Sequence, residues 1–158
     1  MKQPAKLTIY FDASCRLCSS EIHNIKQHDT NNCLTLVDCS SVEFDDSPFK
    51  HEGIDKQDMM NCLHARNEHG EWIKGVAAFE VIYRSVGMTS VAALWGHSIT
   101  RPLAERIYPW VARHRQFLSS LGLHMLFNIW GRHAARQADK KSRQCKSGKC
   151  AVNPKEMT

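Results

Sequence analysis

The stretch that decides the fold is Leu7-Thr8-Ile9-Tyr10-Phe11-Asp12-Ala13-Ser14-Cys15-Arg16-Leu17-Cys18. Its first five residues are mostly β-branched, aromatic or otherwise apolar, which is typical of a buried strand. The run after the second cysteine is polar apart from Ile22 and Ile25, which recur at helical spacing. We therefore predict a strand over 7–11, a short loop, and a helix over 19–28.

Two residues separate Cys15 from Cys18, so both sulfurs fit within one helical turn and can alternate between dithiol and disulfide. At the start of a helix, unpaired backbone amides and the positive end of the dipole stabilise a thiolate. Cys15 is therefore expected to be the accessible, ionised nucleophile, and Cys18 the resolving thiol. We expect Arg16 to lower the pKa of Cys15 further, and Asp12 to cap the helix or to take a proton from Cys18.

The same spacing has two other interpretations. A C-x-x-C pair supplies half of many zinc sites, and it also occurs as an inert pair in a cysteine-rich chain. A zinc ribbon or finger needs a second close pair within roughly 12–20 residues. The next cysteines, Cys33 and Cys39, stand further apart, in and after a predicted strand. A redox dithiol is therefore favoured, and no metal site is expected.

Seven cysteines is an odd number, so a complete set of internal disulfides is impossible. In a reducing compartment this favours redox or metal-binding use of close pairs. Cys145 and Cys150 form a second pair among lysines, which could relay electrons to the first pair or be incidental. Cys33, Cys39 and Cys62 lie in or beside predicted strands, where a free cysteine packs as a small apolar residue.

The rest of the chain continues an α/β pattern. Further strands are predicted over 33–37, 60–65 and 71–74, and helices over 54–59 and 76–86. The acidic residues 38–58 read mainly as a loop, and the turn at 67–70 makes a hairpin of the last two strands. Together these elements predict a thioredoxin-like β-α-β-β-β-α core over residues 1–88, with a mixed sheet flanked by helices.

Appended helices are expected over 89–131, packed on the same domain. One begins near Pro102 and runs toward Arg115, and Pro109 should bend or divide it. A further apolar helix is predicted over 118–130. Residues 132–158 read as a basic tail.

Composition fits one globular domain, since 42% of the residues are hydrophobic and 23% are charged. Charge is uneven: residues 1–83 hold 8 Lys and Arg against 13 Asp and Glu, and residues 84–158 hold 13 against 3. A solvated basic face explains this without a nucleic-acid partner.

Neither a signal peptide nor a membrane-spanning run is recognised, so a cytoplasmic protein without membrane partners is expected.

The run from Tyr10 to Cys18 resembles the signature of the DCC family of thiol-disulfide oxidoreductases, named for a D-x-x-C-x-x-C motif after a first strand. Further similarity lies in the runs 63–66 to Gly70, 74–79, and Tyr108 with 110–115. The resemblance implies a thioredoxin-like fold and disulfide exchange. Thioredoxin-like proteins usually place a cis-proline before the third strand, whereas residues 59–62 contain no proline.

The sequence therefore predicts an enzyme that exchanges two electrons with protein or small-molecule disulfides through Cys15 and Cys18. An external thiol reductant would reset the pair, and no bound cofactor is required. The alternative is a non-catalytic protein, in which the basic second half binds nucleic acid or an acidic partner and the dithiol senses oxidation.

Overall fold

A computed structural model describes residues 6–121 of the 158-residue chain. The predicted basic tail, the Cys145 and Cys150 pair, and most of the apolar helix predicted over 118–130 lie outside the described residues.

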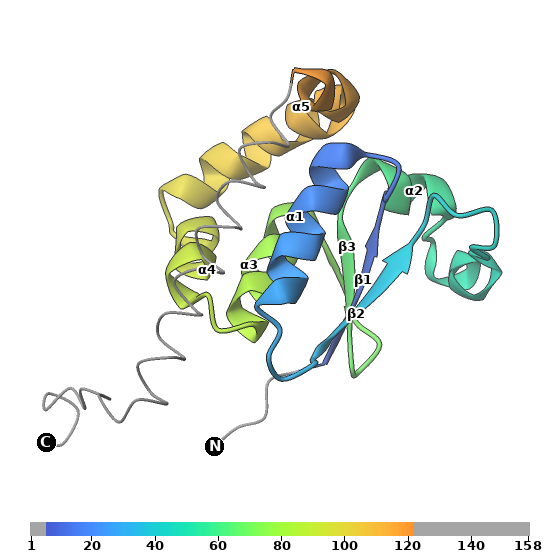
Figure 1. Cartoon of the computed structure of the whole chain (residues 1–158), viewed down its shortest axis with the longest axis horizontal. Helices are drawn as coiled ribbons and strands as arrows, with labels where there is room; N and C mark the ends of the chain where they lie inside the picture. Colours follow the sequence, from blue (N-terminus) through green and yellow to red (C-terminus); the bar gives the residue numbers. More distant parts are fainter. Residues whose placement is uncertain (1–5, 122–158) are drawn as a thin grey trace, which may run out of the picture.

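A four-stranded mixed sheet forms the centre of the fold (Figure 1). Its strands are β1 (Leu7–Phe11), β2 (Leu34–Asp38), β3 (His64–Asn67) and β4 (Trp72–Lys74). They lie in the order β2-β1-β3-β4, with β1 parallel to β2 and antiparallel to β3, and β3 antiparallel to β4. The predicted α/β class and mixed sheet are confirmed.

The helices lie between the strands and after β4. They are α1 (Arg16–Gln27), the 3-10 helix η1 (Ser47–Glu52), α2 (Lys56–Asn61), α3 (Gly75–Ser85), α4 (Thr89–Gly96) and α5 (Thr100–Ser120). Gly75 has a φ of +59°, a conformation that favours glycine and lets β4 lead directly into α3. The long helix α5 packs against α1, α3 and α4 (Figure 1).

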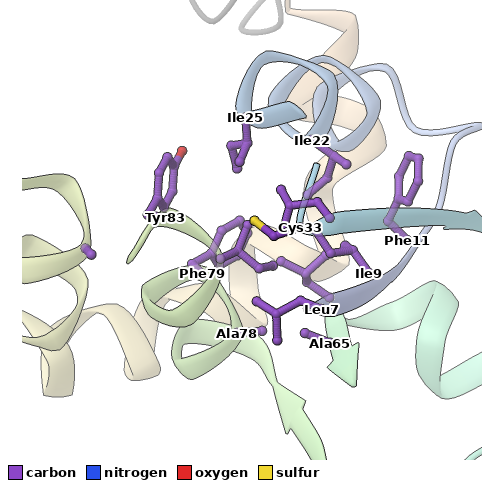
Figure 2. Packing of buried hydrophobic residues seen from close by; sticks show 14 residues of the cluster. Leu7, Ile9, Phe11, Ile22, Ile25, Cys33, Ala65, Ala78, Phe79 and Tyr83 are labelled. Carbon is purple, nitrogen blue, oxygen red and sulfur yellow. The ribbon is translucent and has the colours of Figure 1, made fainter. Parts of the chain in front are cut away.

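The main core lies between the sheet and helices α1 and α3. Successive strand residues point to opposite faces, so Leu7, Ile9 and Phe11 of β1 enter this core together (Figure 2). The helices contribute Ile22, Ile25, Ala78, Phe79, Ile82 and Tyr83. Burying an aliphatic side chain such as Ile9 stabilises the fold by about 1.5–3 kcal/mol. This packing fixes the position of α1 relative to β1.

Tyr10 points to the opposite face of the sheet, where the segment between β2 and β3 covers it. Its ring lies 5.0 Å from the ring of Trp72 and 5.5 Å from that of Phe49, measured between centroids. Cys39, Ile54 and Met59 complete this second cluster.

The strand predicted over 60–65 begins too early. Met60 and Asn61 belong to α2, and β3 begins at His64. Asp55 accepts a hydrogen bond from the Asp58 backbone, and the Asp58 side chain accepts one from the Asp55 backbone. This capping box starts a helix that carries Met59 into the second cluster, and the helix continues to Asn61.

Pro109 does not divide the helix in which it lies, since α5 is continuous from Thr100 to Ser120. Proline removes one backbone donor, but packing on neighbouring elements can hold the turn together. Here the Tyr108 hydroxyl accepts a hydrogen bond of 3.0 Å from the backbone nitrogen of Leu63, which ties this turn to the start of β3.

Within residues 6–121, none of the helices has the length and apolarity needed to cross a membrane.

Candidate functional site

The loop after β1 is fixed by two aspartates before the chain reaches the cysteines. Asp12 Oδ1 accepts hydrogen bonds from the backbone nitrogen of Ser14, at 3.0 Å, and from its hydroxyl. Asp38, at the end of β2, accepts one of 3.2 Å from the backbone nitrogen of Ala13. The neighbouring ends of two parallel strands therefore hold the loop and set the position of Cys15.

Cys15 is itself the residue that caps α1. Its Sγ accepts a hydrogen bond of 3.3 Å from the backbone nitrogen of Cys18. The prediction that Asp12 caps the helix is wrong, because its carboxylate is engaged within the loop. Capping by Cys15 also explains why α1 begins at Arg16 rather than at Ser19, as the periodicity had indicated.

The structure brings the two predicted thiols together. The Cys18 thiol donates to Cys15 Sγ, and the two sulfurs lie 2.7 Å apart. The Cys18 thiol and, more weakly, the Cys18 backbone amide and Arg115 lower the pKa of Cys15 to about 6, against the opposing effect of burial. The hydrogen bond to Cys15 and burial both raise the pKa of Cys18. Cys15 is therefore the sulfur that ionises first.

Arg115 of α5 completes the candidate site, although the sequence alone did not single it out. Its Nη2 lies 2.9 Å from Asp12 Oδ2. The Asp12 side chain is 1% exposed, and Oδ2 has no hydrogen-bond partner within the described part of the chain, so the ion pair is what compensates this buried charge. Arg115 is also the strongest cationic influence on Cys15, whereas Arg16, to which the sequence assigned that effect, is exposed.

The sequence profile of the DCC1-like thiol-disulfide oxidoreductases matches residues 9–121, a range that includes both cysteines and Arg115. This chain belongs to that family. It is also 29% identical over 116 residues to an uncharacterized, chloroplastic protein of Arabidopsis thaliana. That match covers 70% of this chain and 51% of the relative, so the chain spans about half the relative's length. No solved structure matches the chain.

Membership supports a redox function at the level of the DCC1-like family, and the mixed sheet agrees with the thioredoxin-like class predicted for it. The position before β3, where thioredoxin-like proteins usually carry proline, is occupied here by Cys62 and Leu63. No cis peptide bond occurs within residues 6–121.

Access to the DCC1-like dithiol differs from the prediction. Cys15 is 2% exposed, whereas Cys18 is partly exposed. Cys15 lines a groove of about 180 Å³ between the start of α1 and the end of α5. The groove is lined by Ser14, Cys15, Arg16, Gln116, Ser119 and Ser120. The nucleophile is therefore recessed below α5 rather than openly displayed.

Cys18 lines a different hollow, a mostly apolar cavity of about 80 Å³. Phe11, Leu17 and Phe79 contribute to its walls, and Cys62 lines it as well. Burial raises the pKa of the Cys62 thiol. The resolving Cys18, which stays partly exposed, therefore lies against mostly apolar walls.

Of the remaining cysteines of the described part, only Cys62 lines the apolar cavity together with Cys18. Cys33 and Cys39 are buried in the two clusters, which confirms the core packing expected of them. Cys62 is half-buried. Within residues 6–121, no group of three or more His, Cys, Asp or Glu side chains could hold a metal ion.

Proposed function

We propose that this DCC1-like protein is a thiol-disulfide oxidoreductase that exchanges two electrons through Cys15 and Cys18. The observation that carries the proposal is the 2.7 Å contact between the two sulfurs, together with pKa values displaced in opposite directions. A thiolate beside a protonated thiol is the arrangement that disulfide exchange requires.

The reaction has two steps. The Cys15 thiolate attacks one sulfur of a substrate disulfide, forms a mixed disulfide and releases the first substrate thiolate. Cys18 then attacks Cys15 Sγ, loses its proton to the departing second thiolate and closes the Cys15–Cys18 disulfide. The two protein sulfurs give up two electrons in total, and the substrate disulfide becomes one thiolate and one thiol.

An external thiol reductant returns the protein to the dithiol state by the reverse exchange. We propose no bound cofactor for this cycle, because sulfur alone carries the electrons. The five cysteines of the described part are free thiols, which suits a reducing compartment such as the cytoplasm.

Asp12 acts in this scheme as a positioning residue. One carboxylate oxygen holds Ser14 and the other faces Arg115, so the side chain orients the loop that carries Cys15. The appended helical region after residue 88 belongs to the same functional unit, because α5 supplies Arg115.

Trapping of the intermediate tests the proposal. Reduced Cys18→Ser, mixed with a substrate disulfide, should accumulate a mixed disulfide on the peptide that contains Cys15, as read by mass spectrometry. In reduced Cys15→Ser, no mixed disulfide should form on the Cys18 peptide at a rate comparable to that. Disulfide turnover by Cys15→Ser at the wild-type rate, or nucleic-acid binding that is salt-sensitive and survives this substitution, would favour the non-catalytic alternative.

A further inference from the structure

The two sulfurs of the dithiol open onto chemically different surroundings. Cys15 lines the groove between the start of α1 and the end of α5, and Cys18 lines the apolar cavity. A substrate that is attacked by Cys15 therefore enters from the groove side, and the groove selects what enters.

Among residues 6–121, those that line the groove are mostly polar and include no carboxylate. Besides Cys15 it is lined by three serines, one glutamine and Arg16. A second open hollow of about 430 Å³ continues along α1 and shares Arg16 with the groove. Its other walls are Ala13, Ser19, Ser20, His23, Asn24 and Gln27, again without an acidic side chain. Among the described residues that line the two hollows, Arg16 is the only one with a fixed charge.

Two acidic side chains close to the dithiol, Asp12 and Glu21, do not line this entrance. Asp12 is buried and paired with Arg115, and Glu21 lines the apolar cavity, where its carboxylate accepts a hydrogen bond from Tyr83. Positive charge therefore dominates the mouth of the groove, from Arg16 and from the first turn of α1.

We propose that the substrate of the Cys15 groove is a small disulfide that carries carboxylate groups, and that Arg16 pairs with one carboxylate while Cys15 attacks the S–S bond. This inference rests on the proposed disulfide exchange and adds a substrate class to it. The Gln116 amide supplies a further polar contact of the kind that a small, hydrophilic molecule needs. The exchange consumes one substrate disulfide for each protein dithiol, as written above.

Substrate charge can be varied at nearly constant size. The probes are 3,3′-dithiodipropionate (anionic), bis(2-hydroxyethyl) disulfide (neutral) and cystamine (cationic), each mixed with reduced Cys18→Ser. Mass spectrometry of the Cys15 peptide gives the rate of mixed-disulfide formation. Each rate is divided by that of the same probe with dithiothreitol, a neutral dithiol, so that the intrinsic reactivity of the probe cancels.

We expect the normalised rate for the anionic probe to exceed that for the cationic one about tenfold at low salt, and the ratio to shrink in high salt. Arg16→Gln should bring the ratio of the two normalised rates close to one. Gln116→Glu, which places a carboxylate in the same groove, should lower the ratio independently. Arg113→Gln removes an exposed charge of α5 that lines neither hollow, and should leave the ratio unchanged.

Equal normalised rates for the three probes, or an Arg16→Gln variant that keeps the wild-type ratio, would overturn the substrate class and leave disulfide exchange intact. Failure of all three probes to form a mixed disulfide at Cys15 would instead refute the exchange itself.

Discussion

Arg115 Nη2 lies 2.9 Å from Asp12 Oδ2, so an ion pair joins α5 to the loop that presents the dithiol. Both side chains are largely removed from solvent. The pair places a guanidinium beside Cys15 and fixes the carboxylate that orders the loop. Helix α5 is therefore part of the site and not only a neighbour of the sheet.

Arg115→Gln should destabilise the protein by roughly 3 kcal/mol, because it leaves the Asp12 carboxylate buried without its partner. It should also raise the pKa of Cys15, since it removes a cation that stabilises the thiolate. Urea unfolding and the pH dependence of thiolate absorbance measure the two effects. Arg113→Gln is the matched control and should change stability by less than about 0.5 kcal/mol. An Arg115→Gln variant as stable as this control would contradict the role given to the pair.

The reactivity of Cys15 should follow a titration with a midpoint near pH 6. Alkylation of the reduced protein by iodoacetamide, followed on the Cys15 peptide, measures it. In Cys18→Ala the midpoint should rise, because the strongest influence that lowers the pKa of Cys15 is the Cys18 thiol. A midpoint that is the same in this variant would show that the sulfur contact does not stabilise the thiolate.

Asp29 should stabilise the turn between α1 and β2. Its carboxylate accepts hydrogen bonds from the backbone nitrogens of Cys33 and Leu34 and pairs with Lys26 at 2.7 Å. Asp29→Asn should therefore lower the free energy of unfolding at pH 7 by about 1–3 kcal/mol in urea denaturation.

The pH dependence of this contribution has a definite sign. Burial alone would raise the pKa of Asp29, but the hydrogen bonds from Lys26, Cys33 and Leu34 outweigh it and hold the pKa below its ordinary value of 3.8. A folded-state pKa that is lowered stabilises the fold above the ordinary pKa, and this stability is lost as the pH falls below it. The difference between wild type and Asp29→Asn should shrink from pH 5 to pH 2. A difference that grows over this range would contradict the assignment.

Tyr108→Phe should destabilise the fold by about 1–2 kcal/mol. The substitution removes the hydroxyl that accepts the Leu63 backbone hydrogen bond and leaves that donor without its partner. Thermal unfolding measures the loss. Tyr83→Phe serves as the comparison. The Tyr83 hydroxyl donates to Glu21, so its removal leaves no backbone donor without a partner. Unfolding of Tyr108→Phe at the wild-type temperature would show that this link is energetically neutral.

The central part of the fold could be predicted from the sequence because its signals are local. The β-branched and aromatic composition of β1 and the three-and-four spacing in α3 are each contained in a few residues. The start of α1 was misplaced because Cys15 caps it, a role usually filled by serine, threonine, asparagine or aspartate. Likewise Met60 and Asn61 have the composition of a strand start, but the capping box at Asp55 extends the helix through them.

The candidate site was predictable only in its sulfurs. The spacing of Cys15 and Cys18 is a local pattern, and the two thiols are indeed in contact. Arg115 stands in a run that resembles the family, but nothing in its own neighbourhood indicates that α5 folds back onto the dithiol. Tertiary packing also determines the burial of Cys15, which sequence reasoning expected to be accessible.

The most direct test of the account is a single-turnover oxidation of the fully reduced protein by bis(2-hydroxyethyl) disulfide, read by peptide mass spectrometry. We predict that Cys15 and Cys18 become linked to each other before Cys33, Cys39 or Cys62 reacts, and that dithiothreitol reverses the link. Oxidation of those other cysteines while Cys15 and Cys18 stay as free thiols would contradict it.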